Sequence, residues 1–326
     1  MIWAAFRLQR LQLLTLLGLL VAGSVTVVLL RSTMVDFFTS TRLIECVAPN
    51  AGPCPASPED LDAFAANWGD LFLVGRVVIV LLPALVGVFI GAPLFAQELE
   101  QGTHVLAFTQ SVSRTRWMLS KLVVALVPAL VVLVVLQYLV WWWLDAAGVL
   151  GPHANGSFHV LNFGVEHVSP VGYALFAFAL GTFAGAVSRR TLVAMTAGLG
   201  VFVAARFALF GLANRWVPRE RRDAPVGADA DLSQGGGLWV GSGWLDTAGQ
   251  QVSPDRAAAL TRTCKGGTET QEAYTACLQQ SGVARRYVIT IPESSAWLAH
   301  VYDFAVFGGL AVLLLAGTAW ALRRQS

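Results

Sequence analysis

Leu122–Leu144 reads LVVALVPALVVLVVLQYLVWWWL, a run of 23 residues without a charged side chain. An α-helix of this length measures about 34 Å, enough to cross the roughly 30 Å hydrocarbon core of a bilayer. The three consecutive tryptophans Trp141–Trp143 end the run, and tryptophan is enriched where a helix meets the membrane–water interface. The segment therefore predicts a transmembrane helix.

Five other apolar segments are long enough to span a bilayer: Leu11–Leu30, Leu71–Phe95, Val171–Val187, Leu192–Leu212 and Ser295–Leu322. Of the 326 residues, 56% are hydrophobic and 13% are charged, whereas soluble domains carry about 25% charged residues. The mean hydropathy is +0.62. We therefore predict an all-α integral membrane protein with six transmembrane helices, surrounded by lipid.

The formal net charge of the chain is only +2. No zinc-finger, basic-region or RNA-recognition pattern accompanies it, so neither charge nor motif predicts binding to nucleic acid.

Basic residues in the short loops predict the orientation, because cytoplasmic loops are enriched in lysine and arginine. With six spans, one side of the membrane receives both termini and the basic residues Arg7, Arg10, Arg114, Arg116, Lys121, Arg189, Arg190, Arg323 and Arg324. The loop at residues 145–170 contains neither lysine nor arginine. Both termini are thus expected in the cytoplasm. Arginine outnumbers lysine 20 to 2, which is typical of a GC-rich bacterial genome and suggests a multi-pass protein of the bacterial cytoplasmic membrane.

The predicted spans divide the chain into three regions. Residues 1–212 form a membrane domain with helices one to five, residues 213–294 an extracytoplasmic segment, and residues 295–326 the last helix with a cytoplasmic tail. Within the membrane domain, residues 32–70 form an external loop and residues 96–121 a cytoplasmic loop.

Local signals refine the two external segments. A proline near a helix N-terminus is common, so we expect a short helix from Pro58 and helical structure between Ser253 and Gln280. The glycine-rich stretch Gly235–Gly241 builds a poor core, and part of its segment is expected to be loosely ordered.

Gly181 and Gly185 form a Gly-x-x-x-Gly pair in the fourth span. Such a pair lets helices approach closely, which we interpret as packing within the chain.

All four cysteines fall in segments that this topology places outside, where disulfides persist. Four cysteines allow three pairings. The pairing Cys46–Cys54 with Cys264–Cys277 closes the smallest loops, and four free thiols are the alternative.

The cytoplasmic loop between the second and third spans contains the most informative motif, Glu98-x-Glu100-x-Gly102-Thr103. Glycine at position 102 permits a change of chain direction after the second span. A solvated turn followed by basic residues that meet lipid phosphates is the simpler interpretation.

The motif resembles the Glu-x-Glu-x-Gly-Thr signature of ABC-2 type transporter permeases. In that family a Pro-Val-Ser-Arg-like element follows; here it reads Ser111-Val112-Ser113-Arg114, with serine where proline is common. The resemblance implies that loop 96–121 is a coupling helix that docks into a cytoplasmic ATP-binding subunit. Glu98, Glu100 and Arg114 would then be contact or hinge residues, while Gly102 and Thr103 shape the turn.

The same resemblance implies a function. The chain would be the permease subunit of an ATP-binding cassette exporter that moves a small amphipathic molecule, a peptide or a lipid. No Gly-x-x-x-x-Gly-Lys-Ser/Thr motif is present, so the chain is expected to be no enzyme and to hold no cofactor, with ATP and Mg²⁺ bound by two copies of a partner ATPase. A second permease chain completes the pathway, and we favour a homodimer over a heterodimer. The alternative is a non-transporting sensor, immunity or scaffold protein whose external loop binds a partner.

Three charged residues within the spans are candidates for a polar substrate path, because ionisable side chains in a membrane are expensive. They are Arg76, Arg206 and Asp303. For the arginines the alternative is snorkelling to the outer interface, which we favour for Arg76.

Histidines gather in the outer loop between the third and fourth spans. His153, His159 and His167 lie there with Glu166, but their spacing matches no known metal motif. The sequence therefore predicts no metal site.

Overall fold

The computed structural model describes residues 9–47, 54–101, 114–228, 237–266 and 270–324. The chain divides into two compact units. The helical unit comprises residues 1–154, 159–213 and 300–326, and the sheet unit comprises residues 155–158 and 214–299.

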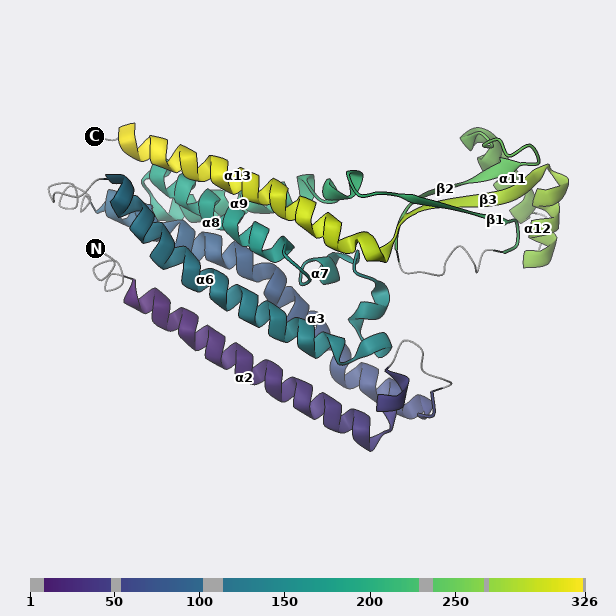
Figure 1. Ribbon diagram of the computed structural model, residues 1–326, viewed down its shortest axis with the longest axis horizontal. Helices are drawn as coiled ribbons and strands as arrows, with labels where there is room; N and C mark the ends of the chain where they lie inside the picture. The colour runs from purple at the N-terminus through teal and green to yellow at the C-terminus, as the bar shows by residue number, and fades with distance from the viewer. Residues whose placement is uncertain (1–8, 48–53, 102–113, 229–236, 267–269, 325–326) are drawn as a thin grey trace. The chain divides into compact units, whose positions relative to one another are not determined.

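Six long apolar helices within the described residues can cross a membrane, which confirms the predicted number of spans (Figure 1). The first span is α2 (Arg10–Ser40). The second consists of α3 (Pro58–Leu85), η2 (Val86–Gly91) and α4 (Pro93–Glu100). The other four are α6 (Arg114–Asp145), α8 (Ser169–Ser188), α9 (Thr191–Ala208) and α13 (Ala296–Arg324).

Several helices extend beyond the predicted apolar runs. The first continues ten residues past Leu30, to Ser40. Pro58 does begin a helix, and Ser57 caps it by accepting a hydrogen bond from the backbone N–H of Asp60 at 3.2 Å. This helix is not a separate short element, because it continues without a break into the second span.

The second span changes its winding midway, at the π-helical segment η2. Pro93 has no N–H to donate to the carbonyl four residues back, and the neighbouring Ala92 N–H bonds instead to Gly87 O, five residues back, at 2.9 Å. Single π turns of this kind are frequent at functional sites.

Helix α8 packs closely against η2 through small residues. A Cβ on Gly185 would lie 2.5 Å from Ala92 O, and one on Gly87 would lie 2.7 Å from Ala177 O. A Cβ on Gly181 would likewise meet the backbone of Gly87. The Gly-x-x-x-Gly pair therefore serves helix packing within the chain, as expected from the sequence.

An aromatic stack fills the core between α2, α3 and α6. The ring centres of Phe38, Phe64, Phe72 and Trp143 follow one another at 5.0, 6.0 and 5.1 Å. After α2, the short helix η1 (Leu43–Cys46) ends at Cys46, which is disulfide-bonded to Cys54.

Between α6 and α8 the chain forms three short elements. These are η3 (Gly148–Leu150), η4 (Pro152–Asn155) and α7 (Val160–Phe163). Single-turn helices of the 3₁₀ type also occur as η5 (Ala213–Arg215) and η6 (Glu293–Ser295).

The sheet unit contains an antiparallel sheet that the sequence analysis did not predict. Its strands are β1 (Glu220–Pro225), β2 (Leu238–Asp246) and β3 (Val283–Ile291), and β3 lies in the centre. Residues 238–241 of the glycine-rich stretch are thus strand and not loosely ordered. Glycine at position 243 makes room for Tyr287 on β3, since a Cβ there would lie 2.5 Å from the phenolic oxygen.

Two helices pack beside this sheet, α11 (Pro254–Gly266) and α12 (Gln271–Gln280), in the region where helical structure was predicted. Thr270 caps α12. The disulfide Cys264–Cys277 joins the two helices, and buried Leu278 and Val283 pack with it.

Candidate functional site

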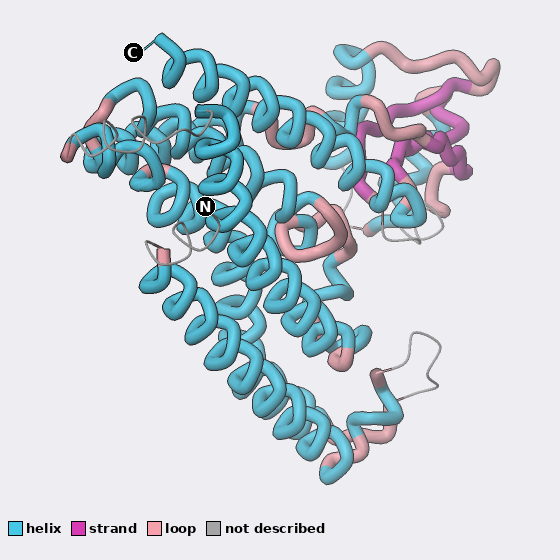
Figure 2. The backbone as a smooth tube through the Cα atoms, turned by 60° about the vertical axis from the view of Figure 1, so that its left-hand side comes forward, coloured by secondary structure: helices cyan, strands magenta, loops and turns pink. Residues whose placement is uncertain are grey.

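The start of α2 and the end of α13 lie at one end of the helical unit (Figure 2). The end of α4, the start of α6 and the α8–α9 turn lie there too (Figure 1). We call this the basic end, because its described part carries Arg10, Arg116, Lys121, Arg189, Arg190, Arg323 and Arg324. Gly102 and Thr103 lie outside the described residues, and Arg114 is the first residue of α6.

Glu98 forms an ion pair with Lys121, which connects α4 to α6. The side chain of Lys121 is 7% exposed, and that of Glu98 is 25% exposed. Trp117 covers the ammonium group, whose nitrogen lies 4.5 Å from the ring centre, and Phe95 packs on Trp117 with ring centres 5.7 Å apart. Glu98 therefore joins the end of the second span to the start of the third.

Glu100 connects α4 to a different helix. Its Oε2 accepts hydrogen bonds from the backbone N–H of Thr191 at 3.1 Å and from Thr191 Oγ1 at 2.9 Å. Thr191 is the first residue of α9, and a carboxylate at a helix N-terminus is favoured by the helix dipole. The two acidic residues of the motif thus hold the end of α4 to both α6 and α9.

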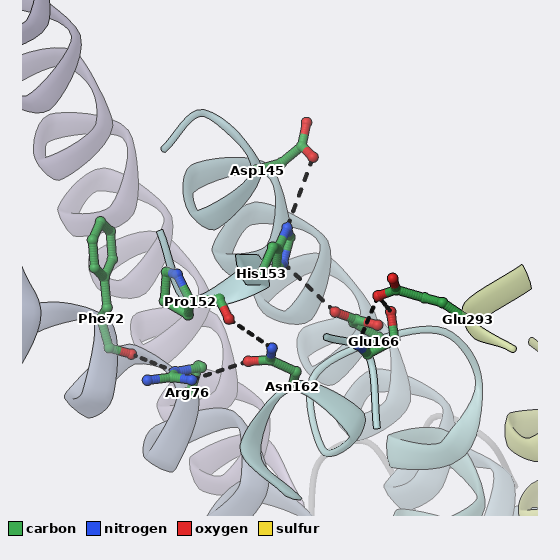
Figure 3. Close-up of polar contacts among 9 residues, drawn as sticks. Phe72, Arg76, Asp145, Pro152, His153, Asn162, Glu166 and Glu293 are labelled. Carbon is green, nitrogen blue, oxygen red and sulfur yellow. Dashed lines mark hydrogen bonds and ion pairs between the residues drawn. The ribbon is translucent and has the colours of Figure 1, made fainter. Parts of the chain in front are cut away.

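Arg76 is a buried residue of α3, and its polar contacts are drawn in Figure 3. Its Nε donates to Phe72 O at 3.2 Å and its Nη1 donates to Asn162 Oδ1 at 3.0 Å. Asn162 in turn donates to Pro152 O at 2.8 Å. The guanidinium therefore bonds to groups within the helical unit, and it joins α3 to α7 through an asparagine that the sequence analysis did not single out.

Arg206 and Asp303 meet on a single aromatic residue of α8. The guanidinium carbon of Arg206 lies 3.5 Å above the ring centre of Tyr173, and the Tyr173 hydroxyl donates to the carboxylate of Asp303. Asp303 is buried. Two of the three residues suggested for a polar path are thus brought together, while Arg76 belongs to the separate Asn162 network.

A third polar cluster consists of Glu166, His167 and His300, whose potential ligand atoms all lie within 4.8 Å of one another. His153 and His159 were grouped with Glu166 and His167 from the sequence. The structure places His153 beside Glu166, with Nε2 3.6 Å from Oε1 (Figure 3), and His159 outside the cluster. His300, which joins it from α13, was missed because it lies 133 positions after His167. Partial desolvation lowers the pKa of His167 below its usual range.

A cavity of about 190 Å³ lies beside η2. Residues of α2, α3 and α6 complete its wall, which is apolar except for Gln12 and Thr15.

Comparison with known proteins gives one match. The family model described as ABC-2 membrane transporter related matches residues 17–213, more than half of the chain. Neither a curated protein nor a solved structure matches the sequence.

Proposed function

This chain belongs to the ABC-2 membrane transporter related family, and we propose that it is the membrane-spanning permease subunit of an ATP-driven exporter. Membership of the family implies an ATPase partner. The arrangement of Glu98 and Glu100 at the basic end is the observation that supports a coupling role best.

The proposed partners are two copies of an ATP-binding cassette ATPase and a second copy of this chain. The sequence contains no Gly-x-x-x-x-Gly-Lys-Ser/Thr motif, so ATP and Mg²⁺ would bind in the ATPase. The basic end would face the cytoplasm, where basic loops accumulate. Both disulfides would then lie outside, in an oxidising compartment.

The loop at residues 96–121 would dock into the ATPase, and the end of α4, which lies in its described part, would carry the movement to the spans. Glu98 and Glu100 fasten the end of α4 to α6 and α9, so a displacement of the loop acts on three spans together. The π segment η2 would absorb the change in angle between α4 and α3, because its hydrogen bonds already depart from the α pattern.

The apolar cavity beside η2 supports an amphipathic small molecule or a lipid as cargo. Its wall includes residues of η2 itself, such as Phe89 and Ile90, so a change in η2 would alter the cavity. Apolar pockets with a few polar groups are the usual form of sites for small molecules.

The test is copurification and ATPase stimulation with a charge swap. The protein is purified in a mild detergent with the ATPase from its host, and three forms are compared: wild type, Glu98→Lys, and Glu98→Lys with Lys121→Glu. A matched control is Glu45→Lys, which changes an exposed acid in η1.

We expect the ATPase to copurify with wild type and its activity to lose stimulation in Glu98→Lys, where two cations face each other. The swap should restore stimulation, because the ion pair re-forms with reversed polarity. If no ATPase associates with the wild type, the exporter function is wrong and the sensor or scaffold function should be pursued. If the single variant is stimulated like the wild type, the ion pair does not transmit coupling.

A further inference from the structure

We propose that Glu166, His167 and His300 form a binding site for a divalent transition metal, with Zn²⁺ as the best-matched ion. The site lies in the helical unit, between the turn that precedes α8 and the first turns of α13. It does not depend on the exporter function.

The geometry of the three ligands suits a small metal ion. One ligand atom from each residue lies within 4.8 Å of the other two. Ligands on a tetrahedral zinc ion, with bonds of about 2.0–2.1 Å, lie roughly 3.3 Å apart. The three ligand atoms therefore need to approach one another by no more than about 1.5 Å, and His167 is exposed.

His300 supplies the strongest evidence that this cluster binds an ion. Its side chain is 0% exposed, and within the described residues its Nε2 has no hydrogen-bond partner. The other ring nitrogen, Nδ1, is hydrogen-bonded to Ser169 Oγ at 2.7 Å. A buried nitrogen without a partner destabilises the fold, and a metal ion would satisfy it.

The ring plane of His300 is also fixed. Phe163 stacks on it with ring centres 3.9 Å apart and planes 13° apart. With Nδ1 held by Ser169, Nε2 is the atom left to bind the metal. Such an arrangement, in which the second ring nitrogen is hydrogen-bonded, is usual for metal-binding histidines.

Neighbouring residues also position Glu166 and His167. Glu166 Oε1 lies 3.6 Å from His153 Nε2, so the carboxylate has a neighbour that orients it. The backbone of His167 adopts a left-handed φ of 51°, and its carbonyl accepts a hydrogen bond from Gln137 Nε2 at 2.6 Å. A non-glycine residue held in this region of φ is strained, and such strain concentrates at functional positions.

Two imidazoles and one carboxylate define the class of metal. Zinc sites with three such protein ligands keep a fourth position for water or another ligand. Calcium and magnesium prefer oxygen ligands throughout, so neither fits this set. A bound ion would join α13 to the turn before α8 by coordination bonds.

The test uses full-length protein purified through a tag that contains no histidine and stripped with a chelator. Zn²⁺ content per chain and affinity are measured by competition with a chromophoric chelator, and Co²⁺ is added as a spectroscopic probe of coordination. The variants are Glu166→Gln, His167→Ala and His300→Ala, and the matched control is His159→Ala from the same loop. Melting curves in chelator verify that each variant is folded.

We expect one Zn²⁺ per wild-type chain and a rise in melting temperature with added Zn²⁺. Glu166→Gln and His167→Ala should weaken binding by at least about tenfold, while His159→Ala binds like the wild type. Because His300→Ala changes a buried residue, the first two variants carry the test if it fails to fold. The proposal is overturned if the wild type shows no binding at about 100 µM Zn²⁺, or if His159→Ala loses as much affinity as His167→Ala.

Discussion

Removing one partner of the Glu98–Lys121 ion pair should destabilise the helical unit measurably. Breaking a buried pair costs about 3–5 kcal/mol, because the remaining charge is left uncompensated. Glu98 is 25% exposed, so water reaches it, and Trp117 keeps a cation–π contact with Lys121. We therefore expect Glu98→Gln to cost about 2–3 kcal/mol, which is less than the cost of breaking a fully buried pair.

The assay is thermal unfolding of the purified protein in detergent at one fixed scan rate, followed by tryptophan fluorescence. A loss of about 2–3 kcal/mol corresponds to a fall in melting temperature of about 3–4 °C for a chain of 326 residues. The matched controls are Glu45→Gln, at an exposed acid, and Lys265→Met, at the other lysine of the chain. Both should change the melting temperature by less than about 1 °C.

A double-mutant cycle measures the interaction energy between Glu98 and Lys121 separately from the other effects of each substitution. Lys121→Met should also destabilise, but Glu98→Gln with Lys121→Met should lose about 1–2 kcal/mol less than the sum of the two, since no charge is then stranded. Strict additivity of the two single changes would refute the ion pair as an energetic link between α4 and α6.

Two other predictions concern packing and the disulfides. Gly181→Val should lower the melting temperature of the helical unit, because its Cβ would meet the backbone of Gly87 and overpacking costs about 1–3 kcal/mol. Gly200→Val should not, because a Cβ there has open space. Equal effects of the two substitutions would contradict the α8–η2 contact. Replacing Cys264 and Cys277 by serine should make the sheet unit sensitive to trypsin, because a crosslink over 13 residues is worth about 3 kcal/mol. The helical unit should resist digestion as before, and an unchanged digestion pattern of the sheet unit would show that the disulfide contributes little.

The sequence predicted the spans well because lipid demands long apolar helices whose backbone is satisfied internally. It did not predict where helices end. Beyond Leu30 the segment Arg31–Ser40, which mixes polar and apolar residues, continues α2. Side-chain packing by Met34 and Phe38 stabilises the helix beyond its apolar run.

The strands of the sheet unit escaped prediction for a physical reason. β1 reads ERRDAP and lacks the alternation of apolar and polar residues that signals a half-buried strand. Its pairing is set by β3, more than 50 residues later in the chain. A strand that owes its structure to a distant partner leaves no local signal.

The sequence also did not predict the partners of the polar side chains, because those partners are distant along the chain. Glu98 and Glu100 were recognised from their spacing, but their partners lie 23 and 91 residues away in the sequence. His300 was not connected with the histidines of the outer loop, although it shares the cluster of Glu166 and His167. Residue type and spacing suggested which positions carry chemistry, and only the packing of helices showed what they contact.

The spacing of the Glu-x-Glu motif itself explains its geometry. Residues two positions apart on an α-helix lie about 200° apart around its axis. Two such carboxylates cannot both face one partner, whereas they can reach helices on opposite sides. In α4 one reaches Lys121 on α6 and the other reaches Thr191 on α9. In the proposed coupling role, a force on the end of α4 would therefore be divided between two neighbouring spans. A coupling element needs this property if it is to move a bundle and not a single helix.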